Sequence, residues 1–358
     1  MARIVIPFGP QHPVLPEPIH LTLTLEDERV VSAVPALGWV HRGLEKLTET
    51  RDMHQMVQVV ERVCGICSMI HAMCYCQGIE AMMGLAVPPR AKWLRVVWSE
   101  LHRLHSHLLW LGLFADSFGF ENLFMQIWRV RERVMDINEA TAGNRVIVSV
   151  NVIGGVRRDL SPEQVAMIRS ELDIVEAELA RLRGPMLDDP TVNRRTRGKG
   201  LLSAEQALEL GAAGPTLRGS GVAQDMRQLG YEAFAELGFE PVTEPDGDSW
   251  SRASVRMREC FQSIDLVRRA LDGLPEGELA AKVKGRPEGE MVTRVEQPRG
   301  ELLYYLRADG SQHLSRVRIR TPTFANIPAL MTMLPGLDLS DVPVVVLSID
   351  PCISCTER

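Results

Sequence analysis

The sequence has no long hydrophobic run, no excess of basic charge and no internal repeat. Its most apolar late stretch, VPVVVLSI at 342–349, is too short to cross a bilayer, and prolines interrupt the N-terminal MARIVIPFGPQHPVLPEP. We therefore expect neither a membrane span nor a secretory signal, so any membrane association would come through partner proteins. The formal net charge of −6 argues against a nucleic-acid partner, because surfaces that bind phosphates usually carry an excess of Lys and Arg.

The composition also excludes collagen, coiled-coil and largely disordered proteins. Hydrophobic residues make up 45% and charged residues 24% of the 358 residues, which is ordinary for a globular chain. We expect an α+β protein that is mainly α, with a central bundle of long helices and small antiparallel β elements near both termini. The expected parts of this single domain are an N-terminal β region over 1–40, a helical core over 41–290, and a C-terminal hairpin and metal-binding tail over 291–358.

Local patterns place these elements along the chain. Alternating leucines over 21–25 predict a strand, with a turn at 26–28 and a return strand. Apolar residues at helical spacing after prolines 88 and 89 predict a long helix, which Gly112 ends or bends. We also expect helices after Ser161 to about 184, after Ser203 and over 249–273, a basic loop over 193–200, a hairpin around 309–310 and a buried strand over 342–349.

Four of the seven cysteines form two Cys-x-x-Cys pairs, Cys64 with Cys67 and Cys352 with Cys355. In a reducing compartment such spacings indicate metal or redox chemistry rather than disulfides. Four thiolates select soft or borderline metals such as zinc, nickel or iron in clusters. A structural zinc site is the plainest interpretation, but zinc ligands usually lie within one small module, whereas these pairs lie near opposite ends of the chain.

The two cysteine motifs carry a specific resemblance. RVCGIC, with His71 four residues after Cys67, and DPCISCTER together resemble the paired signatures of the large subunit of nickel-iron hydrogenases. Further segments, among them GPQHP, HRGLEKL, IGGVRRD, GPTLRGSG and RIRTPTFANIPAL, resemble the quinone-site subunit of respiratory complex I. Hydrogenases that share these segments are of the group 4, energy-converting, membrane-anchored type. Over nearly its whole length the chain resembles their large subunit, which implies the large-subunit fold.

The resemblance implies a nickel-iron centre. Its nickel ligands fall on Cys64, Cys67, Cys352 and Cys355, of which Cys67 and Cys355 would also bridge to iron. The iron of that family carries cyanide and carbon monoxide. Glu45 resembles the family's ligand to a nearby small divalent cation such as magnesium. Here the family's frequent final His is replaced by Arg358, whose charged side chain cannot coordinate a cation.

Catalytic residues are implied in the same way. Heterolytic cleavage of H₂ needs a base beside the metal, and the resemblance assigns this role to the thiolate of Cys352. Glu17 matches the family's proton-relay glutamate, although the sequence alone would favour a surface residue between two prolines. Arg299 corresponds to the guanidinium over the open metal position. Asp350 would hold that guanidinium through a charge-assisted pair.

Two further residues have weaker assignments. Thr323 is expected to donate a hydrogen bond to an iron cyanide, although a buried strand threonine would also explain it. His71 is expected to donate to the bridging sulfur of Cys67, four residues before it on the same helical face. Several other residues need no function: we expect Cys74, Cys76 and Cys260 to pack in the core and His102 and His105 to lie on an amphipathic helix surface.

These assignments predict the catalytic subunit of a nickel-iron hydrogenase that interconverts H₂ with protons and electrons. The implied partners are a small subunit with a proximal 4Fe-4S cluster, ferredoxin-like electron-transfer subunits, membrane antiporter-like subunits and maturation proteins, with iron-sulfur clusters only on partners. The implied location is the cytoplasmic side of the cell membrane. The alternatives are a complex I-like quinone-site or electron-transfer subunit without hydrogenase activity, to which His12 and Tyr75 would point, and a structural zinc protein.

Overall fold

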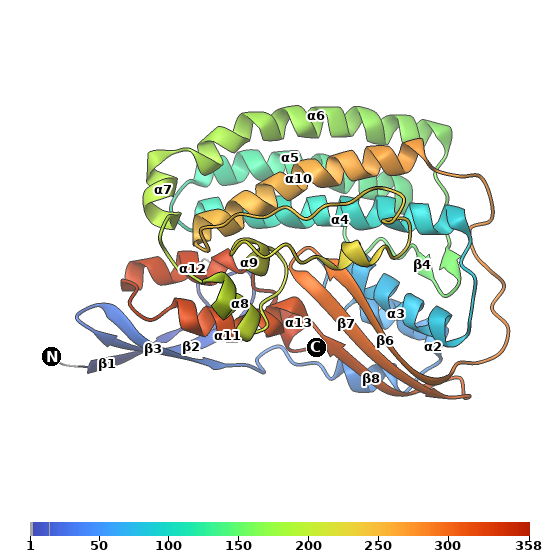
Figure 1. Ribbon diagram of the computed structural model, residues 1–358, viewed down its shortest axis with the longest axis horizontal. Coiled ribbons are helices and arrows are strands. Elements are labelled where there is room, and N and C mark those ends of the chain that lie inside the picture. Colours follow the sequence, from blue (N-terminus) through green and yellow to red (C-terminus); the bar gives the residue numbers. More distant parts are fainter. Residues whose placement is uncertain (1–2, 14) are drawn as a thin grey trace.

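The computed structural model describes residues 3–13 and 15–358, and long helices dominate it (Figure 1). In this part of the chain the long helices are α4 (Pro89–Asp116), α5 (Glu121–Ala142), α6 (Pro162–Leu187) and α10 (Ser249–Asp272). The shorter helices are α1 (Leu44–Thr48), α2 (Met53–Glu61), α3 (Ser68–Met82), α7 (Pro190–Thr196), α8 (Ala204–Glu209), α9 (Pro215–Arg218), α11 (Pro322–Met333), α12 (Val342–Ser348) and α13 (Ile353–Thr356), with short 3-10 helices η1 (Met226–Leu229) and η2 (Leu339–Asp341).

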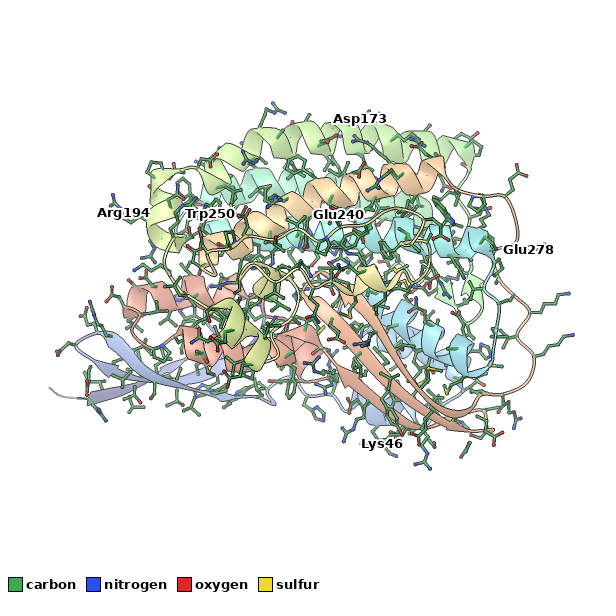
Figure 2. All side chains as sticks on the ribbon, viewed as in Figure 1. Lys46, Asp173, Arg194, Glu240, Trp250 and Glu278 are labelled. Carbon is green, nitrogen blue, oxygen red and sulfur yellow. The ribbon has the colours of Figure 1, made fainter. Side chains whose placement is uncertain are left out.

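Helix α4 is the centre of the helical layer. It packs against α5 and α10, while α6 covers the outer face of α5 (Figure 1). Helix α4 continues for one turn beyond Gly112 to Asp116, so this glycine does not end the helix. A side chain at Gly112 would lie 2.4 Å from the Trp128 ring on α5, so the glycine serves close helix packing. Charged side chains such as Asp173 on α6 and Lys46 on α1 project from the periphery (Figure 2).

Three small antiparallel sheets complete the fold. The first has the order β1 (Arg3–Phe8), β2 (His20–Glu26) and β3 (Arg29–Ala36), and the third has the order β6 (Glu288–Gln297), β7 (Gly300–Asp309) and β8 (Leu314–Arg320). The second contains only β4 (Asn151–Val152) and β5 (Gly155–Val156). Leu21, Leu23 and Leu25 are buried as their alternation predicts, and the hairpin at 309–310 is confirmed. The predicted α+β class with β elements near both ends is therefore confirmed.

Three local predictions are wrong or incomplete. The expected strand over 342–349 is α12, because a short buried apolar run has no periodicity that separates helix from strand, and Pro343 suits a first helical turn. The expected basic loop over 193–200 is partly helical, since Asp189 caps α7. Helix α6 continues through Pro185 to Leu187. Both predicted capping boxes, at Ser161 and Ser203, are confirmed.

Two apolar cores meet at the C-terminal tail. The larger core lies among the long helices, α3 and the β6–β8 sheet, and it includes Cys352 and Cys355. The smaller core joins the N-terminal sheet to α11 and α12, and it includes Ile353. The tail therefore lies between the two cores, and the chain end lies beside α13 near the middle of the molecule, with Glu357 buried and Arg358 partly exposed (Figure 1). Across the described ranges, no helix combines the length and apolarity that a membrane span requires.

Candidate metal centre

The four predicted cysteines converge although 288 residues separate the partners of each contact. The sulfurs of Cys64 and Cys352 lie 3.3 Å apart, and those of Cys67 and Cys355 lie 3.5 Å apart. Cys67 precedes the first turn of α3, and Cys352 precedes α13. All four side chains are buried. The fold thus brings together four soft ligand atoms that can hold a thiophilic metal.

The pKa values of the four cysteine thiols are compatible with binding of a cation. Hydrogen bonds from the other thiols, first that of Cys352, hold the pKa of Cys64 well below its usual range. Burial raises the pKa values of Cys67 and Cys355 well above it. The Cys355 hydrogen bond lowers the pKa of Cys352, but the neighbouring Cys64 thiolate outweighs this and raises it. Cys64 is therefore the most acidic of the four thiols, and a bound metal would release the protons that remain on the cluster.

A small enclosed cavity lies beside Cys352. Its volume of about 20 Å³ suits one molecule the size of water. Glu17, Arg299 and Asp350 line it together with apolar side chains from α4. Arg299 Nη2 lies 2.8 Å from Asp350 Oδ1, and Arg299 Nε donates to the Asp350 carbonyl at 3.0 Å. The predicted pair is thus formed, and it provides a polar wall to a largely apolar space next to a cluster sulfur.

Glu17 is half-buried rather than a surface residue. It lies between β1 and β2, and its carboxylate accepts hydrogen bonds from the backbone N–H of Ile353 and from Ser354 Oγ. The Ser354 N–H donates to the same carboxylate at 3.0 Å. The residue therefore joins the N-terminal sheet to the tail and lines the cavity at the same time.

His71 contacts the cluster, but at a sulfur other than the predicted one. Its Nε2 lies 3.5 Å from Cys355 Sγ, and its Nδ1 lies 2.8 Å from the Tyr304 hydroxyl. Burial lowers the pKa of His71 to about 4, so the ring is neutral. If the Tyr304 hydroxyl donates to Nδ1, Nε2 carries the proton and donates to Cys355. Sequence reasoning missed Tyr304, a buried residue that alternates with partly exposed residues on β7 and that no motif singles out.

Comparisons with known proteins agree with this geometry. The family described as "Respiratory-chain NADH dehydrogenase, 49 Kd subunit" matches residues 117–286 and 279–358, and "Nickel-dependent hydrogenase" matches 42–114. The carbon monoxide-induced hydrogenase of Rhodospirillum rubrum is 42% identical, with 100% of both chains covered. The chain belongs to the family of nickel-dependent hydrogenase and complex I 49 kDa subunits. This confirms the predicted resemblance and the assignment as a hydrogenase-type oxidoreductase, and it supports nickel as the metal.

Other members of this family include both hydrogenases and quinone-linked enzymes. The membrane-bound hydrogenase subunit alpha of Pyrococcus furiosus is 40% identical over 99% of this chain and 87% of that protein. An NADH-quinone oxidoreductase subunit of Koribacter versatilis is 33% identical over 99% and 96%. A chain in the structure of the membrane-bound sulfane sulfur reductase, an archaeal respiratory membrane complex, has a TM-score of 0.95 at 30% identity, covering 99% and 98%.

Glu45, which resembles the family's small-cation ligand, is held by donors from the chain itself. Glu45 Oε1 accepts from Ile319 N at 2.9 Å and from Arg358 Nε at 3.1 Å, and its Oε2 accepts from Arg318 Nη1 at 2.8 Å. Both carboxylate oxygens are therefore engaged, and two guanidiniums would repel a cation. The residues present do not fit a divalent cation at Glu45.

The remaining predicted residues take several positions. Thr323 is buried on α11 rather than on a strand, and its hydroxyl accepts from Cys352 N at 3.2 Å. His102 and His105 are fully buried on α4 and not on its surface, which corrects the prediction. Tyr75 is a core residue whose hydroxyl donates to the Met53 carbonyl at 3.1 Å. Cys74, Cys76 and Cys260 are buried, as predicted.

Proposed function

We propose that this chain interconverts H₂ with protons and electrons at a buried nickel-iron centre. The observation that carries the proposal is the convergence of four buried cysteine sulfurs beside an enclosed cavity lined by Glu17, Arg299 and Asp350. A cavity of this size admits small molecules while excluding larger substrates. The membership of the chain in a nickel-dependent hydrogenase family supports the same reaction.

The four cysteines would hold the metals. We assign Cys64 and Cys352 to nickel alone and Cys67 and Cys355 to nickel and iron, following the family's pattern. When bound, the two metals supply the site that takes up the two electrons of H₂. The iron would carry cyanide and carbon monoxide, and Thr323 would face one of these ligands. Its hydroxyl already accepts from Cys352 N and has its own hydrogen left to donate.

Cys352 and Glu17 would carry the proton. Cleavage of H₂ releases two protons and two electrons, and the Cys352 sulfur, which lines the cavity, would receive a proton at Sγ. Glu17 lines the same cavity and accepts hydrogen bonds from backbone N–H groups of the tail. Because Glu17 is itself partly exposed, its carboxylate can pass this proton from the cavity towards solvent. Among the described residues that line the cavity, the other carboxylate is Asp350, whose Oδ1 is held by Arg299.

Arg299 would orient and shield the reacting molecule. Its guanidinium lines the cavity, and Asp350 fixes it through one side-chain contact and one backbone contact. Ser106 on α4 lies 3.4 Å from Arg299 Nη1 and adds a third anchor. Leu109, Trp110 and Leu113 on the same helix exclude bulk water from the cavity wall. A fixed charge in an apolar space interacts more strongly with a polarised ligand than the same charge would in water.

Electrons would leave through a partner protein. Three cysteines, Cys74, Cys76 and Cys260, remain outside the cluster, which is one fewer than the four thiolates that hold an iron-sulfur cluster. We therefore propose a small subunit with a proximal 4Fe-4S cluster, further ferredoxin-like subunits and membrane antiporter-like subunits. Relatives named as membrane-bound hydrogenase and as part of a respiratory membrane complex support a membrane assembly. We place the chain peripherally, on the cytoplasmic side, after metal insertion by maturation proteins.

Metal analysis tests this function. The complex, purified without oxygen from cells that contain the maturation proteins, should hold about one nickel per chain and show infrared bands of iron-bound cyanide and carbon monoxide. It should also exchange H₂ with D₂O. Zinc as the only metal would leave the structural site as the better interpretation. Quinone or sulfur reduction without H₂ exchange would favour the quinone-linked branch of the family.

A further inference from the structure

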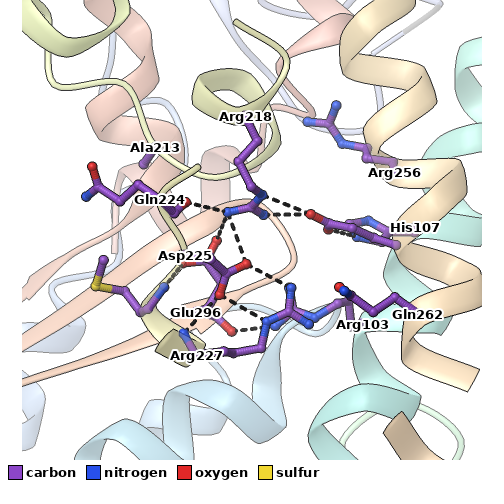
Figure 3. A network of polar contacts seen from close by, with 12 residues as sticks. Arg103, His107, Ala213, Arg218, Gln224, Asp225, Arg227, Arg256, Gln262 and Glu296 are labelled. Atoms are coloured by element: carbon purple, nitrogen blue, oxygen red, sulfur yellow. Dashed lines mark hydrogen bonds and ion pairs between the residues drawn. The ribbon is translucent and has the colours of Figure 1, made fainter. Parts of the chain in front are cut away.

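A network of charged side chains is buried between the helical layer and the β6–β8 sheet (Figure 3). Each member is at most 2% exposed. The members are Glu100 and Arg103 on α4, Arg218 on α9, Asp225 and Arg227 at η1, Glu259 on α10 and Glu296 on β6. We call this set the charged cluster. It contains four carboxylates and three guanidiniums, and the buried guanidinium of Arg256, which faces Asp350, is counted outside this set.

Two of the carboxylates share one nitrogen. Arg218 Nη1 lies 2.8 Å from Glu296 Oε1 and 3.1 Å from Asp225 Oδ2. Two carboxylates this close are costly to ionise together in a buried place. Their other contacts differ. Asp225 also accepts from Arg227 at 2.8 Å and 3.0 Å, whereas the second oxygen of Glu296 accepts from Met226 N at 3.0 Å. Asp225 is thus the better stabilised anion, and Glu296 is the residue that takes up a proton.

The groups that contact Glu296 come from α4, α9 and the segment around η1, while its cross-strand partner on β7, Glu301, pairs with Arg294 and Arg320 instead. The contacting groups are Arg103 from α4, whose Nη2 donates to the Glu296 carbonyl, Arg218 from α9, Asp225 and Arg227 at η1, and Tyr231, whose hydroxyl accepts from Glu296 N. Burial, and then the charge of Asp225, raise the pKa of Glu296 to about 7, against the opposing effect of Arg218 and Arg103. Burial lowers the pKa of the nearby His107 to about 4, so that ring adds no charge at neutral pH.

Glu296 is linked to both members of the Arg299 and Asp350 pair. Only Gln297 and Pro298 separate it from Arg299 along the chain. Through Arg218 it also reaches Glu259 on α10, since Arg218 Nη2 lies 2.8 Å from Glu259 Oε1.

Glu259 continues this link towards the metal centre. It stands one helical turn after Arg256, whose Nε lies 4.0 Å from Asp350 Oδ2. In the described chain neither of these two atoms has a hydrogen-bond partner. A change of charge at Glu296 can therefore reach Asp350 through Arg218, Glu259 and Arg256.

We propose that Glu296 and Asp225 share one exchangeable proton, and that Glu296 is a positioning residue whose ionisation sets the charge presented to Asp350. Loss of the proton strengthens the attraction of Arg218 to Glu296 and weakens its hold on Glu259. Glu259 then attracts the Arg256 charge more strongly, in competition with the attraction of Arg256 to Asp350. The proton sharing stands on its own, while its consequence for turnover depends on the proposed hydrogenase function.

Infrared titration of the intact complex tests the proton sharing. We expect a band of a protonated buried carboxyl group that disappears with rising pH at a midpoint of about 7, the raised pKa of Glu296. Glu296→Gln should lack this band. Glu290→Gln, on the same strand but with a side chain that is 56% exposed, should retain it and serves as the matched control. The same band and midpoint in Glu296→Gln would overturn the proposal.

Thermal stability gives a second readout. The pKa of Glu296 is raised from 4.5 to about 7 in the folded protein, so the folded chain holds a proton over this range that the unfolded chain has lost. The melting temperature of the wild type should therefore fall with rising pH over this range, relative to Glu296→Gln. Parallel curves would contradict the proposal.

Asp225→Asn decides the matter if Glu296→Gln folds poorly. Removal of the neighbouring negative charge should move the infrared midpoint to lower pH, and an unchanged midpoint would overturn the shared proton. For turnover, Glu296→Gln should lose a pH dependence near 7 that Glu290→Gln keeps. If the complex exchanges no H₂ but the infrared titration holds, the proposed function fails and the proton sharing stands.

Discussion

The four cysteines of the candidate metal centre, Cys64, Cys67, Cys352 and Cys355, form a thiol cluster that is buried like the charged cluster, yet the polar atoms of the two are satisfied in different ways. In the charged cluster each guanidinium contacts at least one carboxylate of the same chain. Within the described residues, the cluster sulfurs contact one another, His71 and one backbone N–H at hydrogen-bond distance. Buried polar groups that the chain does not complete itself indicate an external ligand, here a metal.

The largest expected effect is at the thiol cluster. Cys352→Ser replaces a soft ligand and the proposed proton acceptor with a hard, weakly acidic hydroxyl. We expect loss of nickel and a fall in H₂ exchange of about 100-fold or more. Mutation of residues that only hydrogen-bond to metal ligands already lowers metal affinity or activity by about 10- to 100-fold. Nickel content and exchange rate measure this. Cys260→Ser, at another buried cysteine, should keep both, and equal losses in the two variants would mean a general folding defect.

In the charged cluster, by contrast, we expect a substitution to lower the free energy of unfolding. Arg218→Met leaves Asp225, Glu259 and Glu296 without their shared partner, and breaking a buried ion pair costs about 3–5 kcal/mol. Chemical denaturation would measure this loss. Arg258→Met on α10 removes a half-exposed ion pair with Glu244 and should lower the free energy of unfolding by about 1 kcal/mol or less. If both substitutions cost the same, the charged cluster is not completed by internal pairing as we describe.

Glu17 shares a feature with each cluster. Donors of the chain itself satisfy its carboxylate, as in the charged cluster, and it also lines the cavity beside the thiol cluster. Glu17→Gln keeps the hydrogen-bonding shape but cannot carry a proton at this position. We expect H₂ evolution to slow about 100-fold with nickel content unchanged. Glu28→Gln, on the exposed turn after β2, is the control. Unchanged turnover in Glu17→Gln would remove this residue from the proton path.

Local features were predictable from the sequence, and long-range ones were not. The N-terminal hairpin and the capped helices after Ser161 and Ser203 follow from patterns of a few residues. The strand predicted over 342–349 is a helix because tertiary burial, not periodicity, decides such a short apolar run. The site residues came from family resemblance, and their roles stay predictions, as do the proposed boundaries within the domain. No local pattern relates Glu296 to Asp225, because five separate elements bring the charged cluster together.

The smallest effect is expected at Glu45, which resembles the charged cluster rather than the thiol cluster. Its two oxygens are paired with Arg318 and Arg358, whose side chains are 59% and 18% exposed. Arg358→Ala should therefore cost about 1 kcal/mol or less, and magnesium should not change the melting temperature of the wild type. Metal analysis after dialysis provides the check. Stoichiometric magnesium bound to the wild type, and lost in Glu45→Gln, would contradict this expectation and would show that Glu45, like the four cysteines, binds an external metal.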